Sequence, residues 1–411
     1  MRDPVKLIMV TEMNNNKYYN MVDNGDGTMT VTYGRVGKNP TTMKYDIYEW
    51  DRIYRQKTGK GYKDVTDLYR QQASTGKYKA MDDDEIETLI TQLQNKSRQF
   101  TGKYYDNSVT VTQEMLIEAQ DILNDAALCV GKNTAGNLND FNKYLLKLFS
   151  TLPRMMGDVR SSLCSTGEPK EMQHILQREQ DLIDNLKAQA VTARQQLTVA
   201  DDKTICDALG IVVSKCSSDD MKIITDNLVD LDSRYKLNRA WVVRNNARDE
   251  GFDEYLKNNG LKNNNKNVKT YWHGTGTENV FSIMATALQL NPSNAKITGK
   301  MFGNGIYSAP KAKKSLGYTS LAGSYWKGGS DDRGYMFLNA VITGNTLDVY
   351  DNNEIHNGIR IYNLDGDSFS SKLSEYHSVY AHAGSALRND EVIVYNQNQV
   401  ASRYLVEITY K

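Results

Sequence analysis

The sequence predicts a multidomain α+β protein with three parts: a small β-rich domain, an α-helical bundle and a mostly antiparallel α+β domain. A chain of 411 residues exceeds the usual domain size of about 100–200 residues, so more than one core is expected. Apolar residues alternate as in strands near the start, recur at helical spacing in the middle, and form short strand-like runs near the end. These changes divide the chain into residues 1–75, 80–200 and 202–411.

Composition and charge exclude several classes of protein. Hydrophobic residues make up 39% and charged residues 24% of the chain, as in ordinary globular proteins. The 50 basic and 50 acidic side chains cancel, which excludes a globally basic nucleic-acid binder but not a local basic patch. We see no apolar run of about 18 residues and no signal peptide, so no membrane partner is expected. The four cysteines form no C-x-x-C pair and no cluster with zinc spacing, which indicates reduced thiols in an intracellular protein and no bound metal.

The first 75 residues contain two predicted strands and one predicted helix. Strands are expected at residues 17–22 and 28–33, joined by a turn at 24–27 whose residues tolerate positive φ. A helix is expected near 47–54, where the apolar residues share one face.

Four helical patterns between residues 80 and 200 predict a bundle. Their apolar residues fall at 86–93, 115–126, 141–152 and 175–186. The acidic run at 82–85 predicts a helix start, where the helix dipole favours acid. Thr110 and Gln113 resemble a capping box for the second helix, and Pro153 is expected to stop the third. After residue 202, strand-like runs follow at 211–213, 340–342, 392–395 and 404–410.

Four segments of this last region hold residues suited to ligand binding or catalysis, and each has an ordinary structural alternative. At 271–275 a strand ends in His273 and a glycine whose backbone can approach a bound amide, although such a histidine is more often structural. Residues 298–309 predict a glycine-punctuated loop that runs into a strand. An ordinary hairpin would have the same pattern. Residues 314–318 offer a hydroxyl and a ring that can stack on a flat heteroaromatic. Glu391 begins an apolar strand, or lies in a solvated loop.

In this order and with these flanks, the four segments closely resemble the catalytic domain of the poly(ADP-ribose) polymerases. That family carries a W-H-G-S strand, a G-x-M-F-G-x-G-I-Y-F-A segment, a K-S-x-x-Y segment and an N-E-Y-I-V-Y strand. Its His-Tyr-Glu triad corresponds here to His273, Tyr307 and Glu391. The resemblance covers residues 202–411 and implies an ADP-ribosyltransferase fold that uses NAD+ as its substrate.

The resemblance implies how the nicotinamide end of NAD+ is bound. The backbone of Gly274 and the hydroxyl of Ser315 should bind the nicotinamide amide, and Tyr318 should stack on the ring with Tyr307 on its other side.

On the adenosine side, His273 should bind the ribose. Thr275 stands where the family usually has serine and keeps a hydroxyl, and Asn279 matches the family's pocket segment. Gln289 stands where an arginine is common, which is a departure from the family pattern.

The expected chemistry centres on Glu391. Cleavage of the nicotinamide–ribose bond creates an oxocarbenium-like centre, as in glycoside hydrolysis. A carboxylate beside it can accept a hydrogen bond from the ribose hydroxyl, stabilise the positive charge and orient an acceptor hydroxyl. The resemblance implies polymer synthesis, since family members without this glutamate generally stop after one unit. No metal is needed.

The N-terminal region resembles a second family. Residues 33–37, Tyr-Gly-Arg-Val-Gly, are similar to the W-G-R-V-G signature of the WGR domain, and residues 18–19 and 57–62 match its flanks. Tyr33 replaces the tryptophan but keeps an aromatic ring. Since that domain contacts DNA near strand breaks, Tyr33 and Arg35 are the expected DNA-binding residues. Nine basic and five acidic residues between 33 and 70 suit phosphate contacts, although a solvated surface has the same composition.

Residues 80–200 resemble, through 149–153 and 175–186, the helical regulatory domain of DNA-dependent polymerases. Together these features predict an NAD+-dependent poly(ADP-ribosyl)transferase that DNA breaks stimulate, that modifies proteins including itself and that releases nicotinamide. We expect a monomer when free, intracellular and associated with DNA in a nucleus or nucleoid. Two alternatives stay open: transfer of a single ADP-ribose, and a nucleic-acid-binding module with an inactive transferase fold.

Overall fold

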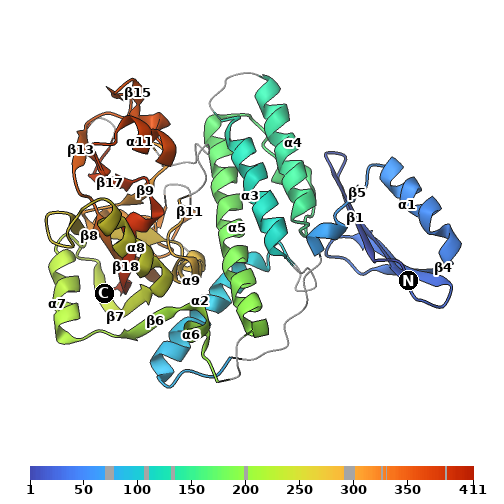
Figure 1. Ribbon diagram of the computed structural model, residues 1–411, viewed down its shortest axis with the longest axis horizontal. Helices are drawn as coiled ribbons and strands as arrows, with labels where there is room; N and C mark the ends of the chain where they lie inside the picture. The colour runs from blue at the N-terminus through green and yellow to red at the C-terminus, as the bar shows by residue number, and fades with distance from the viewer. Residues whose placement is uncertain are drawn as a thin grey trace. The chain divides into compact units, whose positions relative to one another are not determined.

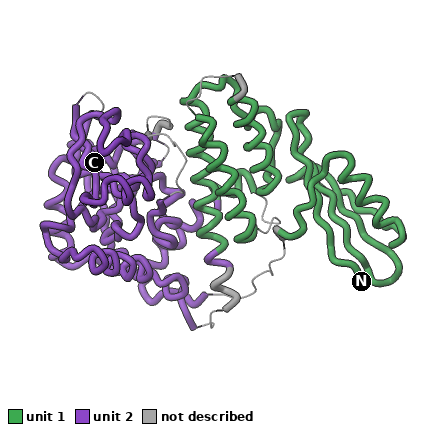
Figure 2. Tube along the Cα trace, turned by 45° about the horizontal axis from the view of Figure 1, so that its top comes forward, with its two compact units in different colours: residues 1–74, 99–190 green, residues 75–98, 191–411 purple. Residues whose placement is uncertain are grey.

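The computed structural model describes residues 1–69, 78–105, 111–130, 135–198, 202–290, 301–324, 327–329, 331–384 and 387–411. The chain forms two compact units, residues 1–74 with 99–190 and residues 75–98 with 191–411 (Figure 2). Their helices and mostly antiparallel sheets confirm the predicted α+β class. Each helix in the described ranges is too short or too polar to cross a membrane. The division into three domains stays a prediction.

The first unit begins with a five-stranded antiparallel sheet of order β4-β3-β2-β1-β5. The strands are β1 Val5–Thr11, β2 Asn15–Asp23, β3 Thr28–Arg35, β4 Thr41–Asp46 and β5 Lys63–Asp64. Both predicted strands and the turn between them are confirmed, and the turn places Gly25 and Gly27 at positive φ. Helix α1, Trp50–Gly59, buries Trp50 and Ile53 against one face of the sheet. We call residues 1–69 the N-terminal module.

Long helices follow the module, as the apolar spacing predicts. They are α2 Asp84–Thr101, α3 Gln113–Ala127, α4 Ala135–Thr151 and α5 Pro169–Thr198. Helix α4 ends two residues before Pro153, as expected. The predicted capping box of α3 is wrong: the cap is Thr112, whose hydroxyl accepts a hydrogen bond from the Met115 N–H at 3.3 Å. A cap serves the amide three residues on, so a helix that begins at Gln113 cannot use Thr110, which lies outside the described residues.

The second unit holds two larger sheets (Figure 1). It also holds two short two-stranded sheets, β10 Gly323–Ser324 with β11 Lys327–Gly328 and β14 Ile355–His356 with β15 Ile359–Arg360. The first of the larger sheets has the order β6-β7-β18-β12-β8 and is antiparallel; the second has the order β13-β16-β17-β9, with one parallel pair, β13 and β16. Their strands are β6 Ile211–Lys215, β7 Tyr235–Asn245, β8 Val268–Thr275, β9 Ile306–Ser308, β12 Arg333–Ile342, β13 Thr346–Val349, β16 Ser378–Ala381, β17 Glu391–Val394 and β18 Val400–Tyr410. The helices are α6 Ile205–Leu209, α7 Ser218–Asn227, α8 Asn246–Asn258, α9 Thr277–Thr286, α10 Ala312–Leu316 and α11 Gly366–Lys372.

The two larger sheets meet where β8 and β9 end. Strand β8 is an outer strand of its sheet. The Trp272 N–H donates to the Ala309 carbonyl at 2.9 Å, and the Ala309 N–H donates back at 2.8 Å. Strand β9 in turn pairs with β17, with Tyr307 opposite Ile393. These pairings bring three strands, far apart in the sequence, to one place.

Most of α2 belongs to the second unit, although the sequence groups it with the later helices. The Glu85 carboxylate accepts a hydrogen bond from Trp241 Nε1 at 3.1 Å, and Lys215 Nζ lies 2.7 Å from the Asp83 carboxylate. Because these contacts join residues more than 100 positions apart, a local pattern cannot predict them.

Candidate active site

The predicted triad comes from the three strands that meet at this place. His273 lies near the end of β8, Tyr307 is the central residue of β9, and Glu391 is the first residue of β17. The His273 ring contacts the Tyr307 backbone directly, with Nδ1 at 3.0 Å from the carbonyl oxygen. The charge of Glu391 is one of the influences that raise the pKa of Tyr307, after burial, so the carboxylate lies near this ring.

The hydrogen bond of His273 fixes which ring nitrogen carries the proton. A carbonyl oxygen can only accept, so Nδ1 must be the donor. Burial lowers the pKa of His273, which favours the neutral ring at neutral pH. Nε2 then keeps its lone pair and can accept a hydrogen bond from a hydroxyl.

Glu391 is a buried carboxylate with one oxygen engaged and one open. The residue is 6% exposed. Its Oε1 forms an ion pair with Lys314 Nζ, whereas Oε2 is buried without a hydrogen-bond partner among the described residues. Burial raises the pKa of Glu391 and the Lys314 charge opposes that rise. An unsatisfied buried acceptor is costly, so a ligand hydroxyl that donates to Oε2 would be bound favourably.

Lys314 is a site residue that the sequence analysis did not assign. In this segment the sequence predicts ligand-binding roles for Ser315 and Tyr318, and it predicts none for the lysine. In the structure, Lys314 Nζ reaches both Glu391 and the Asn389 carbonyl, the latter at 3.2 Å. The signal that could have found it is the presence of a lysine in a segment that the family resemblance assigns to the same site as Glu391. The pairing itself depends on the tertiary fold.

Gly274 lies where β8 touches α10. A Cβ atom there would be 1.8 Å from the Ser315 carbonyl oxygen, so only glycine fits. Trp272 directs its N–H and C=O away from β12, toward Ala309, and backbone groups of a strand alternate sides with each residue. Gly274 therefore turns its own N–H and C=O to the same outer edge, where a ligand amide can pair with both.

Two tyrosines flank this edge. The Tyr307 hydroxyl accepts from the Phe302 N–H at 2.9 Å and donates to the Gly303 carbonyl at 2.8 Å, which fixes its ring against the preceding loop. Residues 298–300 of that predicted loop lie outside the described residues. Tyr318 follows α10 and is 51% exposed. Burial, and then the charge of Glu391, raise its pKa, so this ring also lies near the carboxylate. Ser315 is buried beside them.

Comparison with known proteins gives matches that agree with this geometry. Residues 221–410 match the family model of the poly(ADP-ribose) polymerase catalytic domain. "Uncharacterized protein 101L" of Invertebrate iridescent virus 6 is 32% identical over 185 residues, which are 45% of this chain and 76% of that protein. "Putative poly [ADP-ribose] polymerase-like 100L" of the same virus is 28% identical over 47% of this chain and 95% of its own length.

The chain belongs to the poly(ADP-ribose) polymerase family. It is an NAD+ ADP-ribosyltransferase. A longer match supports the assignment: "Poly [ADP-ribose] polymerase 1" of Oryza sativa is 23% identical over 94% of this chain and 44% of its own length.

Three further positions compared with the polymerase pattern lie at or after the end of β8. Thr275 closes the strand opposite Tyr335, and Asn279 lies in the first turn of α9. The Gln289 side chain donates to the Thr286 carbonyl, so this departure from the family arginine is bound to the last residue of the preceding helix, α9.

The expected DNA-binding residues belong to the first unit, and the triad belongs to the second. The Tyr33 ring stacks on Tyr19 with centroids 5.5 Å apart. Arg35 donates to the Asn14 carbonyl at 2.9 Å and to the carbonyls of Met156 and Gly157 at 3.1 and 2.7 Å. Its guanidinium therefore binds the segment that follows α4.

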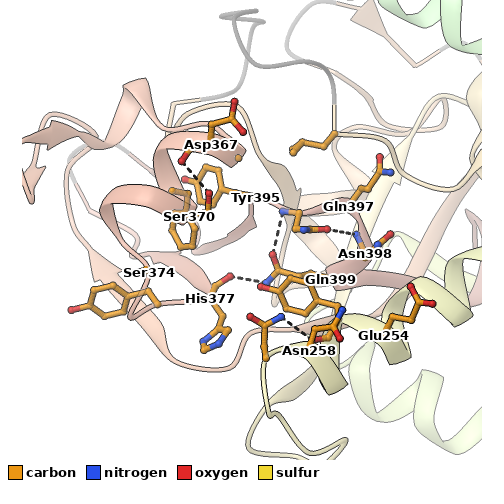
Figure 3. A pocket seen from close by; sticks show the side chains of 17 residues that line it. Glu254, Asn258, Asp367, Ser370, Ser374, His377, Tyr395, Gln397, Asn398 and Gln399 are labelled. Atoms are coloured by element: carbon orange, nitrogen blue, oxygen red, sulfur yellow. Dashed lines mark hydrogen bonds between the residues drawn. The ribbon is translucent and has the colours of Figure 1, made fainter.

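A surface pocket of about 780 Å³ lies at the far end of β17 from Glu391, between α8 and α11 (Figure 3). Gln399 crosses it and donates to the His377 carbonyl at 2.6 Å. The described residues that line it include no residue predicted for catalysis or NAD+ binding. This pocket is therefore not the catalytic site of the transferase.

Proposed function

We propose that this enzyme builds poly(ADP-ribose) on proteins, including itself, when it binds DNA strand breaks. One observation supports the polymer-forming part above all. Glu391 is buried, is backed by Lys314, and keeps Oε2 open beside Tyr307 and Tyr318. That oxygen can hold a ribose hydroxyl during both bond cleavage and chain extension.

The proposed placement of NAD+ assigns residues of the site to its nicotinamide end and to its adenosine ribose. The nicotinamide ring would lie between Tyr307 and Tyr318, with its amide on the backbone edge of Gly274 and on the Ser315 hydroxyl. Aromatic rings suit a flat heteroaromatic cation. Nε2 of His273 would accept a hydrogen bond from the adenosine ribose.

The reaction follows from this placement. The bond between ribose C1 and the nicotinamide nitrogen breaks, and nicotinamide leaves with the electron pair. Positive charge develops on the ribose, where the Glu391 carboxylate stabilises it. An acceptor oxygen then forms the new bond to C1, and a hydroxyl acceptor loses its proton toward Glu391. During elongation the acceptor is a ribose hydroxyl of the chain already attached.

The DNA-dependent part of the proposal concerns the N-terminal module, as a WGR-like reader of breaks through Tyr33 and Arg35. Aromatic and basic side chains gather there, as in surfaces that stack on nucleic acid and contact phosphate. Lys57 Nζ lies 3.9 Å from the Tyr19 ring centroid, on which Tyr33 stacks. The Oryza sativa relative matches 94% of this chain. We propose that the protein is a monomer when it is free of DNA.

Labelled NAD+ tests the proposal directly. The full chain is incubated with NAD+ alone, with intact circular DNA, and with the same DNA after nicking. Nicotinamide release and the length of protein-bound label are then measured. We expect long chains with nicked DNA and little product otherwise. Single units would favour mono-ADP-ribosyl transfer, and DNA binding without nicotinamide release would favour an inactive transferase fold.

A further inference from the structure

Asp390, immediately before Glu391, is bound on both carboxylate oxygens. Its Oδ2 accepts from the Tyr380 hydroxyl at 2.9 Å, and its Oδ1 accepts from the Ala383 N–H at 2.7 Å. Burial opposes ionisation of this carboxyl, but these donors outweigh burial and lower the pKa of Asp390. The ionised Asp390 carboxylate therefore accepts hydrogen bonds from residues at the end of β16.

Tyr380 is held in turn by rings that directly follow β13 and β16. The His382 ring lies 4.7 Å from the Tyr380 ring and stacks on Tyr350 at 4.5 Å with an angle of 9°. His382 Nε2 lies 2.7 Å from the Asp348 carboxylate. The ring that donates to Asp390 thus has a defined place.

The residues on either side of Asp390 are anchored from a different element. Lys314 of α10 binds the Asn389 carbonyl and pairs with Glu391. Strand pairing adds a third restraint, since Glu391 lies opposite Ala381. Residues 389 to 391 are therefore held by contacts with α10 and by contacts with β16.

We infer that Asp390 is a positioning residue, which with Tyr380 fixes the direction of the Glu391 side chain. Asp390 lies directly before β17, where the chain enters the strand and successive side chains point to opposite faces. Binding Asp390 to β16 on one face therefore turns Glu391 to the other, toward Tyr307 and Tyr318. The inference rests on the catalytic role proposed for Glu391.

Three variants of the full chain test this inference. Asp390→Ala removes both hydrogen bonds. Asp390→Asn keeps both, because its oxygen can accept from Ala383 and its amide can donate to the Tyr380 oxygen. Tyr380→Phe removes one and keeps the ring. Asp367→Asn, at an exposed carboxylate on α11, is the matched control. Nicotinamide release gives kcat and the KM for NAD+, and thermal unfolding gives Tm.

We expect Asp390→Ala to lower kcat at least tenfold, since a misplacement of about 1 Å can cost about 10² in rate. The KM for NAD+ should change less than about threefold, and Tm should stay near wild type, because Asp390 does not itself contact NAD+ in this account. The kcat of Tyr380→Phe should lie between that of Asp390→Ala and that of the wild type. Asp390→Asn and the control should keep most of the activity.

Other outcomes overturn the inference. These are a wild-type kcat for Asp390→Ala, equal losses in Asp390→Ala and Asp390→Asn, or a joint change of kcat, KM and Tm that marks a folding defect. Glu391→Gln, measured alongside, separates the two claims. If that variant keeps full activity, the role proposed for Glu391 fails; if it is impaired while Asp390→Ala is not, only the positioning inference fails.

Discussion

At the scale of single residues, two opposing influences set the charge of Glu391. Burial raises its pKa, and the Lys314 ammonium group lowers it. The net pKa lies above the ordinary value for a glutamate, about 4.3. Only the ionised form can stabilise positive charge on the ribose, so activity should fall as pH decreases through this pKa.

Replacing Lys314 with Met should shift that fall to higher pH. Without the ammonium group, burial acts unopposed and the Glu391 pKa rises further. The acid limb of kcat/KM for nicotinamide release reports the free enzyme, and we expect it to move to higher pH. Lys313→Met, at the exposed neighbour on α10, is the control. A uniform loss of rate with an unmoved acid limb would contradict this account of Lys314.

At the scale of elements, a buried ion pair joins the end of α4 to α5. Arg154 Nη2 lies 2.7 Å from the Glu179 carboxylate, and their side chains are 3% and 1% exposed. Burial opposes ionisation of Glu179, but Arg154 and Arg178 outweigh it and lower its pKa. A lowered pKa means that the pair stabilises the fold at neutral pH and that this stabilisation is lost as pH falls through the folded-state pKa.

Glu179→Ala should therefore destabilise the helices at neutral pH. Removing one partner leaves Arg154 buried without its counter-charge, which typically costs about 3–5 kcal/mol. Chemical unfolding at pH 7 measures the loss, and a second series in acid should show a smaller difference from wild type. The matched control replaces both partners, Arg154→Met with Glu179→Met, and should lose much less. Equal losses in the single and double variants would refute this explanation.

Local periodicity predicts the elements better than it predicts their pairing. The strands β2, β3 and β18 and the helices α3, α4 and α5 follow from apolar spacing, because each buries one face. Helices α7 and α8 were missed, since their apolar residues are few and scattered among polar ones. Local patterns cannot predict contacts between residues that are distant in the sequence. The parallel pairing of β13 with β16 and the attachment of α2 to the second unit are two such contacts.

In the candidate site too, local motifs predict some residues, and contacts between distant residues are not predicted. Motifs with fixed spacing identified His273, Tyr307 and Glu391 before any fold was known. The anchors of Glu391 are different. Lys314 and Tyr380 reach it or its neighbour from other elements, and nothing in their own segments specifies that contact.

At the scale of the whole molecule, the proposed signal from DNA must leave the N-terminal module. Within the first unit, that module forms hydrogen bonds with the segment after α4. Asn16 Nδ2 donates to the Arg154 carbonyl at 2.8 Å, Arg35 donates to the Gly157 carbonyl at 2.7 Å, and Arg160 Nε donates to the Glu12 carbonyl at 3.0 Å. Asn16 therefore connects the proposed DNA reader to Arg154 of the buried ion pair, and Arg35 connects it to residues 156 and 157 of the same segment.

Arg35→Ala should reduce stimulation by nicked DNA and leave activity without DNA nearly unchanged. It removes the contacts with the segment after α4, and no residue of the triad lies in its unit. Binding titrations at several salt concentrations show whether a phosphate contact is also lost, in which case the salt slope falls by about one. Wild-type stimulation in this variant would refute the connection.

The central claim is that Glu391 drives transfer and elongation of ADP-ribose from NAD+, and one paired measurement tests it. The full chain and its Glu391→Gln variant are incubated with labelled NAD+ and nicked DNA, and the protein-bound label is sized on a gel. We predict long chains from the wild type. The variant should bind NAD+ but form no chains, with nicotinamide release reduced by about 10²–10³, as when one electrostatic contact to the transition state is lost. Chains of wild-type length from the variant would contradict the account.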